Sequence, residues 1–377
     1  MKPGKERVLT LFMSNGYSLL RWREEGILSR EILLYQTFLA QGVFDTVQIF
    51  SYDAGDADLV RQAPEYVGIQ ILAPRRGRLR GGKAAVWSLC GVVRHRAAIA
   101  RSAWLKTNQI SGAWAAVAAR YLTGARLMIR LGYVLSRRFA LNGQKLQAAA
   151  AGVVEHIAFR AAESVVVTSE AAAAPLRATP STARKVHLAP TYVDVSAFSA
   201  KAAYRFDEPV LYIGRLEPQK NILNLVMGCR LAGVGLDIVG AGGLEDEIRR
   251  LAAAPGAPVR LLGRMPNEAL PALLRDHSLF ALPSLHEGLP KVLIEAMASG
   301  LICVGSNIPG TTDLIKDGAT GYLMEGFDSE AIAACLLRAL RERNPAVGAA
   351  ARSLVADRFS LETYVAREAK LYGTAAG

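Results

Sequence analysis

Long hydrophobic runs are missing from this sequence. No segment approaches the roughly 18–20 consecutive apolar residues that a membrane-spanning helix needs. The apolar run at 8–13 is too short for the core of a secretory signal and is better explained as a first buried strand. We therefore expect a cytoplasmic protein, either soluble or attached peripherally to the inner face of the cell membrane.

Cysteine is scarce as well. No cysteine lies in a CxxC pair, and no histidine cluster accompanies any of them. We therefore expect buried free thiols and no metal site. The four cysteines are Cys90, Cys229, Cys303 and Cys335.

Acidic residues are few in the first half of the chain. Residues 1–200 contain 26 Lys and Arg against 13 Asp and Glu, a net charge of +13. Residues 201–377 contain 19 against 20, a net charge of −1. This asymmetry predicts an acidic partner for one half only: nucleic acid, an anionic membrane surface or an anionic substrate.

The second half alternates between short apolar runs and helical segments. Wholly apolar strands separated by helices indicate a parallel sheet that is covered on both faces. Ligands bind such sheets beyond the carboxyl ends of the strands, which directs attention to the loops there. The expected strands are 209–213, 236–239, 259–262, 279–282 and 302–305, and the expected helices are 222–231, 244–253, 291–299 and 329–341. Asn267 is expected to cap a further helix.

The first half shows a noisier version of the same alternation. At 377 residues the chain is long enough for two domains, and we place their connection near 190–206. The expected strands are 8–11, 47–50, 103–106, 127–129 and 165–167, with a helix at 29–40.

The stretch 287–295 is the first candidate site, because it places two glutamates eight residues apart. Pro290 suits the first turn of a helix, so Glu287 precedes that helix and Glu295 lies on its second turn. Free N–H groups at the helix start form an anion site between two carboxylates that can bind hydroxyls. This pattern matches a nucleotide sugar, although two such glutamates can also be merely solvated.

The loop 214–221 is the second candidate, at the end of another expected strand. Gly214 allows close approach of the backbone to a ligand. Arg215 and Lys220 can both reach a diphosphate, one as a planar fork and one as a point charge. The alternative is an ordinary surface loop with two cations.

Together these loops resemble glycosyltransferase family 4, the retaining enzymes of GT-B architecture. The matching residues are G-R-L-x-x-x-K-N at 214–221, G-A-G-G at 240–243, and P-S-L-H-E-G-L-P-K-V-L-I-E-A-M-A-S-G at 283–300, which holds the family's E-x7-E motif. The resemblance covers roughly residues 209–340, and across the first half it is only architectural.

The resemblance implies an α/β fold of GT-B architecture, with two Rossmann-like domains facing across a cleft. Residues 1–200 would bind the acceptor and residues 201–355 the donor. Residues 356–377 would hold a C-terminal helix that crosses back to the N-terminal domain.

The resemblance also implies residue roles. Arg215 and Lys220 would hold the donor diphosphate and neutralise the leaving group, and Glu287 would contact hydroxyls of the transferred sugar. Glu295 would bind the ribose, the amides of Lys291 and Val292 would meet the phosphates, and the base would lie against Arg264 and Met265. The implied donor-binding residues are Gly214, Arg264, Met265, Gly288, Leu289, Lys291, Val292 and Glu295.

Cations and helix amides aimed at the developing diphosphate charge lower the barrier, so neither a metal nor a cofactor is expected besides the nucleoside-diphosphate sugar as co-substrate. Asp56-Ala57-Asp58 has the form of the metal-binding DxD motif of the other glycosyltransferase architecture. It lies in an acidic turn far from the motif cluster, and we interpret it as a structural turn.

The first half offers three candidates for the acceptor or the cleft. Family members usually place a histidine after a strand here, but the equivalent 127–133 has none, and Arg130 is one possible electrostatic substitute. Gly16 follows the first strand, and Asn108 lies in the segment 106–109 after another. Loops of this kind also turn chains without binding anything.

A dense basic loop precedes an amphipathic apolar segment at 86–101. This combination is typical of a membrane-surface element, with a solvated basic face over a core helix as the alternative. The basic residues of the loop are Arg75, Arg76, Arg78, Arg80 and Lys83.

We therefore predict a retaining, metal-independent hexosyltransferase of surface polysaccharide biosynthesis. Its expected partners are a glycan or lipid-linked acceptor and an anionic membrane surface. A sugar-nucleotide epimerase of the same fold is the closest alternative. Nucleic-acid binding would account for the positive charge of the first half. However, it usually requires aromatic side chains among the cations on which bases can stack, and the basic region offers only Trp87. A dehydrogenase is disfavoured because Glu245 replaces the last small residue of a GxGxxG pattern.

Overall fold

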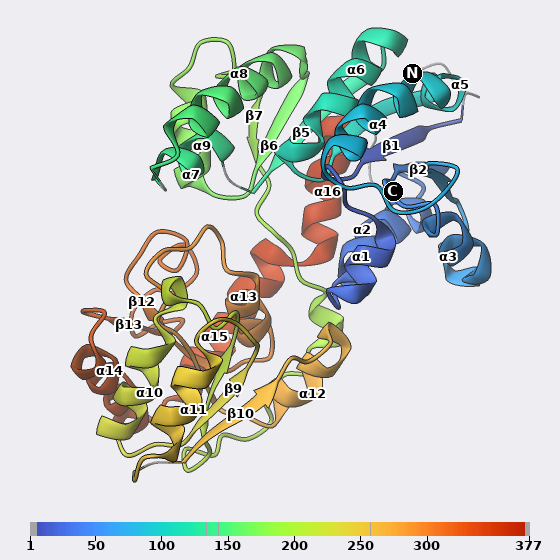
Figure 1. Ribbon diagram of the computed structural model, residues 1–377. Helices are drawn as coiled ribbons and strands as arrows, with labels where there is room; N and C mark the ends of the chain where they lie inside the picture. The colour runs from blue at the N-terminus through green and yellow to red at the C-terminus, as the bar shows by residue number, and fades with distance from the viewer. Residues whose placement is uncertain (1–5, 133, 142, 257, 374–377) are drawn as a thin grey trace. The chain divides into compact units, whose positions relative to one another are not determined.

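The computed structural model of the protein describes residues 6–132, 134–141, 143–256 and 258–373 (Figure 1). The chain divides into two compact units. Unit 2 comprises Thr191–Tyr364, and unit 1 comprises the chain on either side of it. The sequence-based boundaries at 200 and 355 lie near these two points.

Unit 1 contains a parallel sheet of seven strands in the order β3-β2-β1-β4-β5-β6-β7. Strands β1, β2 and β6 are fully buried, as expected for a sheet with helices on both faces. The strands are β1 (Val8–Phe12), β2 (Thr46–Phe50), β3 (Ile69–Leu72), β4 (Ser102–Thr107), β5 (Arg126–Leu131), β6 (Ser164–Val167) and β7 (Val186–Leu188).

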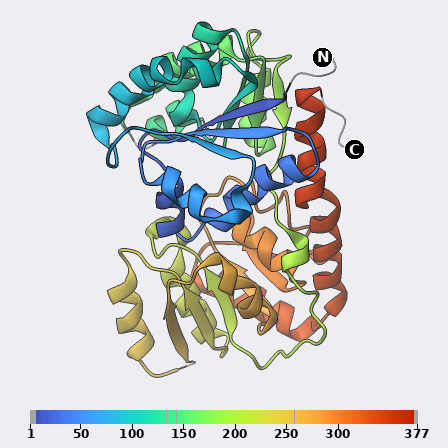
Figure 2. The same ribbon diagram turned by 90° about the vertical axis from the view of Figure 1, so that its right-hand side faces the viewer.

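The helices of unit 1 follow from the direction in which the chain moves across this sheet. The steps from β1 to β2 and β3 run one way, and the steps from β3 through β4 and β5 to β6 run the other way. Because parallel crossovers are right-handed, the two sets of helices cover opposite faces (Figure 2). The helices are α1 (Leu19–Glu24), α2 (Leu28–Ala40), α3 (Asp56–Gln62), α4 (Gly81–Arg94), α5 (Arg96–Ile99), α6 (Ala113–Thr123), α7 (Leu135–Leu141), α8 (Lys145–Ala161) and α9 (Glu170–Arg177).

Unit 2 contains a second parallel sheet, of six strands in the order β10-β9-β8-β11-β12-β13. The strands are β8 (Val210–Ile213), β9 (Leu236–Val239), β10 (Val259–Gly263), β11 (Leu279–Leu282), β12 (Ile302–Ser306) and β13 (Tyr322–Met324). The helices are α10 (Ile222–Leu231), α11 (Glu245–Ala253), α12 (Leu270–Arg275), α13 (Lys291–Ala298), α14 (Ser329–Glu342) and α15 (Pro345–Phe359).

Local sequence explains where several of these helices begin. The first turn of α11 holds Glu245, Asp246 and Glu247, which interact favourably with the helix dipole. Asp328 caps α14 by accepting a hydrogen bond from the amide of Ala331 at 2.8 Å. The predicted α/β fold of two doubly wound parallel sheets is confirmed. The predicted cap at Asn267 is wrong, because Pro266 holds the capping position and Asn267 already lies in a short 3-10 turn.

The last helix, α16 (Leu361–Tyr372), begins in unit 2 and ends in unit 1. Its second half is anchored in the core of unit 1. The Lys106 ammonium donates to both carboxylate oxygens of Glu368, at 2.6 and 2.9 Å, and both side chains are fully buried. The indole of Trp104 donates to the carbonyl of Tyr372 at 3.2 Å.

Three of the four cysteines are buried, as predicted, and burial raises the pKa of the Cys229 and Cys335 thiols to about 12. The prediction is wrong for Cys90, which is exposed on α4. Among the described residues no helix is both long enough and apolar enough to span a membrane.

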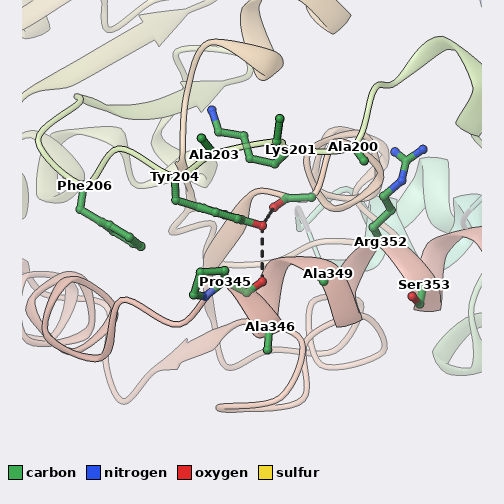
Figure 3. A pocket seen from close by; sticks show the side chains of 12 residues that line it. Ala200, Lys201, Ala203, Tyr204, Phe206, Pro345, Ala346, Ala349, Arg352 and Ser353 are labelled. Atoms are coloured by element: carbon green, nitrogen blue, oxygen red, sulfur yellow. Dashed lines mark hydrogen bonds between the residues drawn. The ribbon is translucent and has the colours of Figure 1, made fainter.

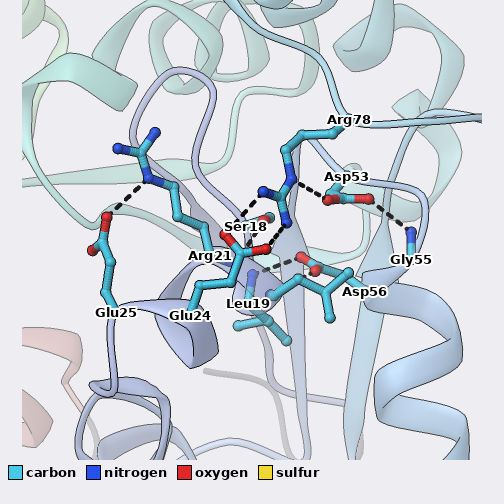
Figure 4. Close-up of polar contacts among 10 residues, drawn as sticks. Ser18, Leu19, Arg21, Glu24, Glu25, Asp53, Gly55, Asp56 and Arg78 are labelled. Atoms are coloured by element: carbon cyan, nitrogen blue, oxygen red, sulfur yellow. Dashed lines mark hydrogen bonds and ion pairs between the residues drawn. The ribbon is translucent and has the colours of Figure 1, made fainter. Parts of the chain in front are cut away.

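Asp56 and Asp58 of the DxD-like segment lie in the first turn of α3 and have different surroundings. Figure 4 shows the contacts of Asp56. Asp56 is buried and accepts hydrogen bonds from the amides of Leu19 and Leu20, at 2.8 and 3.0 Å, and from the Ser51 hydroxyl at 2.5 Å. Burial raises the pKa of this carboxyl group, and these hydrogen bonds oppose the rise. Asp58 is exposed and pairs with Arg61. Asp56 therefore holds the start of α1 in place.

Arg78 departs from the other cations of its loop. Its guanidinium pairs with Glu24 at 2.7 Å and with Asp53 at 2.7 Å, which fastens the basic loop to α1 (Figure 4). The other four basic side chains predicted for this loop, those of Arg75, Arg76, Arg80 and Lys83, are exposed. Arg78 is thus held by two carboxylates of the fold, whereas the other four cations of the predicted basic loop are exposed.

Candidate functional site

The sheet of unit 2 has a switch point between β8 and β11. On one side of this point the chain moves from β8 outward to β10, and on the other side it moves from β11 to β13. The loops after β8 and β11 therefore diverge in opposite directions and leave a crevice at the carboxyl edge, where ligands bind in this type of sheet. These loops, 214–221 and 283–290, are the two that the sequence singles out.

Backbone and side-chain hydrogen bonds join the two loops. The amide of Leu285 donates to the carbonyl of Gln219 at 2.9 Å, and the Gln219 side chain donates to the carbonyl of His286 at 2.9 Å. The Asn221 side chain, which follows a short 3-10 turn, donates at 2.7 Å to the carbonyl of Phe327, which lies outside both loops. The two loops therefore form one connected structure.

An ion pair between Lys220 and Glu287 crosses this switch point. The two side chains are only 14% and 10% exposed, so both charges are largely removed from water. The buried Tyr212 hydroxyl lies beneath the loop and donates to the carbonyl of Arg215 at 3.0 Å. Burial raises the pKa of Tyr212, and the charge of Glu287 raises it further. The site thus places a cation and a carboxylate in contact where both are largely shielded from solvent.

Arg215 differs from Lys220 in its surroundings. Its guanidinium pairs with Glu217 at 2.7 Å, and both side chains are exposed. Exposed ion pairs are weak, so the Arg215 side chain can leave Glu217 for a more strongly charged ligand.

Gly240 and Gly242 of the G-A-G-G run lie against the 214–216 loop. A Cβ atom on Gly240 would lie 1.8 Å from the carbonyl oxygen of Gly214, and one on Gly242 would lie 2.4 Å from that of Leu216. The amide of Leu216 donates to the carbonyl of Ala241 at 3.1 Å. These glycines therefore serve the close packing of the loop that carries Arg215.

Helix α13 supplies the third part of the site. It begins directly after Pro290, so the amides of Lys291 and Val292 lie in its first turn, where a helix has no acceptors of its own. The Lys291 ammonium lies 4.7 Å from the ring centre of Tyr192. Glu295 is 3% exposed, whereas Glu287 lies on the loop. Leu293, Ile294 and Met297 are fully buried, and burial contributes roughly 1.5–3 kcal/mol for each such side chain, which keeps the helix in place.

Gly310, after β12, contacts the same loop and was missed by the sequence analysis. Its φ is 86°, and a Cβ atom there would lie 1.9 Å from the carbonyl oxygen of Gly288. The Pro309-Gly310 pair at a strand end is the signal that could have indicated this turn. Among the described residues the buried hydroxyl groups of Ser284 and Thr311, near these loops, have no hydrogen-bond partner.

We expect Gly310→Ala to lower kcat/KM of the reaction at this site by about 100-fold, because the new methyl group must displace Gly288 and with it Glu287, and a misplacement of ~1 Å can cost that much. Gly318→Ala is the matched control: its φ is 70°, but a Cβ atom there meets only the end of the Arg338 side chain at 3.4 Å. Steady-state kinetics on both variants test this, and equal activities would contradict the role of Gly310.

The loop after β10 holds the remaining predicted donor residues. Arg264 is exposed, and Met265 is half-buried against the core of unit 2. Gly240 donates its amide to the carbonyl of Gly263 at 2.8 Å, so this loop begins beside the G-A-G-G run. Gly288 is exposed and Leu289 is half-buried, between Glu287 and the start of α13.

Unit 1 has its own switch point, between β1 and β4, and the three candidates there lie at its carboxyl edge. Gly16 has a φ of 75° in the turn after β1. The amide of Asn108 donates to the carbonyl of Phe12 at 2.9 Å, and Arg130 Nη1 donates to the carbonyl of Asn108 at 3.3 Å. The structure therefore brings Asn108 and Arg130 together.

Lys106 and Tyr133 belong to the two segments of unit 1, 106–109 and 127–133, that the sequence singles out. Lys106, in the segment considered as an acceptor contact, lies inside β4 and is fully buried against Glu368, so this contact is wrong for Lys106. Tyr133 of the histidine-free segment lies outside the described residues. Of the histidines in unit 2, His277 is buried against Asp237 at 3.0 Å, and His286 is exposed next to Glu287.

A cavity of about 650 Å³ in unit 2 is distinct from these loops (Figure 3). It is lined by the segment 200–206, Gly300 and the first half of α15, and the Tyr204 hydroxyl donates to the carbonyl of Gly300 at 2.6 Å. Gly300 lies before β12, at the amino edge of the sheet, so none of the predicted donor residues lines this cavity.

Residues 199–352 match the family model described as glycosyl transferases group 1. The chain is 30% identical over 171 residues to AmsK, an amylovoran biosynthesis glycosyltransferase of Erwinia amylovora, a match that covers 41% of this chain and 42% of that protein. It is 35% identical over 179 residues to a phosphatidyl-myo-inositol mannosyltransferase of Mycobacterium leprae, covering 43% and 47%. The matches thus span less than half the length of these relatives.

The fold is shared over almost the whole chain. The structure of HepE from Anabaena, solved with UDP and glucose, superposes with a TM-score of 0.73 at 17% identity and covers 98% of this chain and 99% of that one. The chain therefore has the GT-B fold, with a segment at 199–352 that matches glycosyl transferases group 1.

Proposed function

We propose that this protein is a retaining hexosyltransferase that moves a sugar from a nucleoside-diphosphate sugar to a glycan or lipid-linked acceptor. The observation that carries the proposal is the Lys220–Glu287 ion pair at the switch point of unit 2, beside the start of α13. In this pair Lys220 is a cation that can bind a diphosphate, and Glu287 is a carboxylate that can accept hydrogen bonds from sugar hydroxyls.

The proposed reaction breaks the bond between the anomeric carbon and the diphosphate oxygen. An acceptor hydroxyl forms the new bond to that carbon, and its proton leaves with the nucleoside diphosphate. Negative charge grows on the diphosphate, where Lys220, Arg215 and the first amides of α13 stabilise it. When the Lys220 ammonium also binds the diphosphate, its ion pair with Glu287 weakens. The carboxylate of Glu287 can then accept hydrogen bonds from sugar hydroxyls.

The remaining donor roles extend this scheme. Glu295 would bind the ribose, and Arg264 and Met265 would contact the base. Retention of the anomeric configuration, the assignment to family 4 and the independence from a metal ion rest on the resemblance of the E-x7-E stretch, and we propose them on that basis. Lys220 and Arg215 supply the positive charge that a metal ion otherwise provides.

The relatives suggest the setting. The names of two of them refer to amylovoran biosynthesis and to phosphatidyl-myo-inositol. A third, from Escherichia coli, is a galactosyltransferase named for a diphosphoundecaprenol acceptor, and it is 32% identical over 134 residues. We therefore propose a role in surface polysaccharide biosynthesis, with the protein in the cytoplasm and attached peripherally to the inner face of the membrane.

Thermal shift with a panel of UDP- and GDP-sugars would identify the donor, and we expect one of them to raise the melting temperature. Release of the nucleoside diphosphate should then require an acceptor and should be unchanged by EDTA. Dependence on added divalent cations would contradict the metal-independent scheme. Conversion of the nucleotide sugar to its epimer, without an acceptor and without net release of nucleotide, would instead indicate an epimerase. The absence of any nucleotide-sugar binding would refute both functions.

A further inference from the structure

Helices α4, α6 and α8 form one layer of unit 1. Neighbouring helices in this layer pack against each other, and all three belong to crossovers that run the same way along the sheet, so they cover one face of it (Figures 1 and 2). We call the solvent side of this layer the α4–α6–α8 face. The sheet covers its other side.

Large apolar side chains lie exposed on this face. Leu89 and Val93 are four residues apart, and the pairs Trp114–Tyr121 and Leu146–Val153 are each seven apart, so each helix presents one apolar stripe. Their exposed fractions run from 50% for Trp114 to 86% for Leu146. Single exposed apolar side chains are ordinary, but parallel stripes on three adjacent helices indicate an interaction surface.

The charge of this region has one sign only. Residues 66–154 contain 15 Lys and Arg and no Asp or Glu. Exposed cations stand at both ends of the stripes, with Lys83 and Arg94 on α4 and Lys145 and Arg160 on α8. Glu155 on α8 is buried and accepts hydrogen bonds from Leu135 and Ser136, so it does not offset this charge at the surface.

We propose that the α4–α6–α8 face docks on an anionic phospholipid bilayer, with its apolar stripes between the headgroups and its cations against the lipid phosphates. The proposal deepens the proposed function, since it names the surface that would deliver a lipid-linked acceptor to unit 1. Helices with apolar stripes flanked by cations lie in membrane interfaces in this way. Nucleic acid would pair with the cations but would leave Leu146 and Val153 in water.

The single exposed tryptophan provides a direct probe. Of the four tryptophans only Trp114 is exposed, because Trp22, Trp87 and Trp104 are buried. With the full-length chain we expect vesicles of phosphatidylglycerol and phosphatidylcholine to shift the emission to shorter wavelength, and brominated lipids to quench it. Pure phosphatidylcholine should do neither. Trp114→Phe should abolish the shift. Sedimentation with anionic vesicles but without any shift or quenching would overturn the proposal.

A matched pair of triple variants tests the stripes themselves. We expect Leu89→Ser/Tyr121→Ser/Leu146→Ser to lower partition onto anionic vesicles by about tenfold or more, since the lost apolar area no longer enters the interface. Val67→Ser/Leu231→Ser/Leu337→Ser removes three exposed apolar side chains elsewhere and should bind like the original protein. Thermal melts establish that both variants fold.

Other outcomes would overturn the membrane partner. Equal vesicle binding by both triple variants would show that the apolar stripes do not contribute to membrane binding. Binding to duplex DNA but not to vesicles would indicate nucleic acid, and a dimer that only the first variant dissociates would indicate a second copy of the chain. Binding of the nucleotide sugar without lipid is measured separately and should not change in the first variant, so failure of the donor site and failure of the membrane face can be told apart.

Discussion

Lys220→Ala should lower kcat/KM for sugar transfer by about two to three orders of magnitude, the usual effect of removing one preorganised group that stabilises transition-state charge. Lys220 lies at the switch point of unit 2, where the diphosphate leaving group would develop its charge. The same change leaves the Glu287 carboxylate, which is 10% exposed, without its cation. We therefore also expect the free energy of unfolding of unit 2 to fall by ~1–3 kcal/mol, the cost of an unsatisfied buried group.

Glu287→Gln should separate the contribution of the Lys220 charge from that of the Glu287 carboxylate. The amide keeps the shape of the carboxylate and frees Lys220 from a strong competitor, so donor affinity should change little while kcat falls. The double variant should then lose less than the sum of the two single losses, because the two side chains act on one another.

Arg249→Ala is the matched control for these variants. Arg249 pairs with Glu245 on α11 in the same unit, but both side chains are exposed. The test is completed by steady-state kinetics and nucleotide-sugar binding, measured on the two single variants, the double variant and Arg249→Ala. If Lys220→Ala has the kinetics of Arg249→Ala, the donor site lies elsewhere.

Much of unit 2 could be predicted because four of its strands, β8, β9, β11 and β12, are buried on both faces. The predicted strands 236–239 and 279–282 and the helix 222–231 have the bounds of β9, β11 and α10. The three strands that were missed, β3, β7 and β13, lie at sheet edges and are short and partly exposed. β3, for example, has an exposed Gln70 in its centre, so it lacks a continuous apolar run.

The location of the site was also predictable, because the carboxyl ends of parallel strands meet at one edge whatever the details of the loops. The individual contacts were not. Gly310 matters through a backbone approach to Gly288, and Arg78 pairs with Glu24 across 54 residues. Such pairings depend on how distant segments pack, and the composition of either segment alone does not indicate them.

The pair Lys106–Glu368 is the clearest case, since its members are 262 residues apart and Lys106 stands in an otherwise ordinary strand. We expect Lys106→Met to lower the free energy of unfolding of unit 1 by ~3–5 kcal/mol, because it leaves a fully buried carboxylate without its partner. All four tryptophans belong to unit 1, so urea unfolding followed by tryptophan fluorescence reports this unit.

Arg177→Met, which removes an exposed ion pair with Glu170 in the same unit, should cost no more than about 1 kcal/mol. The double variant Lys106→Met/Glu368→Leu should recover a large part of the loss, since a buried pair can often be replaced by apolar side chains of similar volume. The Tyr372 hydroxyl would still lose its bond to Glu368, 2.9 Å in the structure, which limits the recovery. A double variant as unstable as Lys106→Met would mean that the charges themselves, and not their pairing, hold α16 in unit 1.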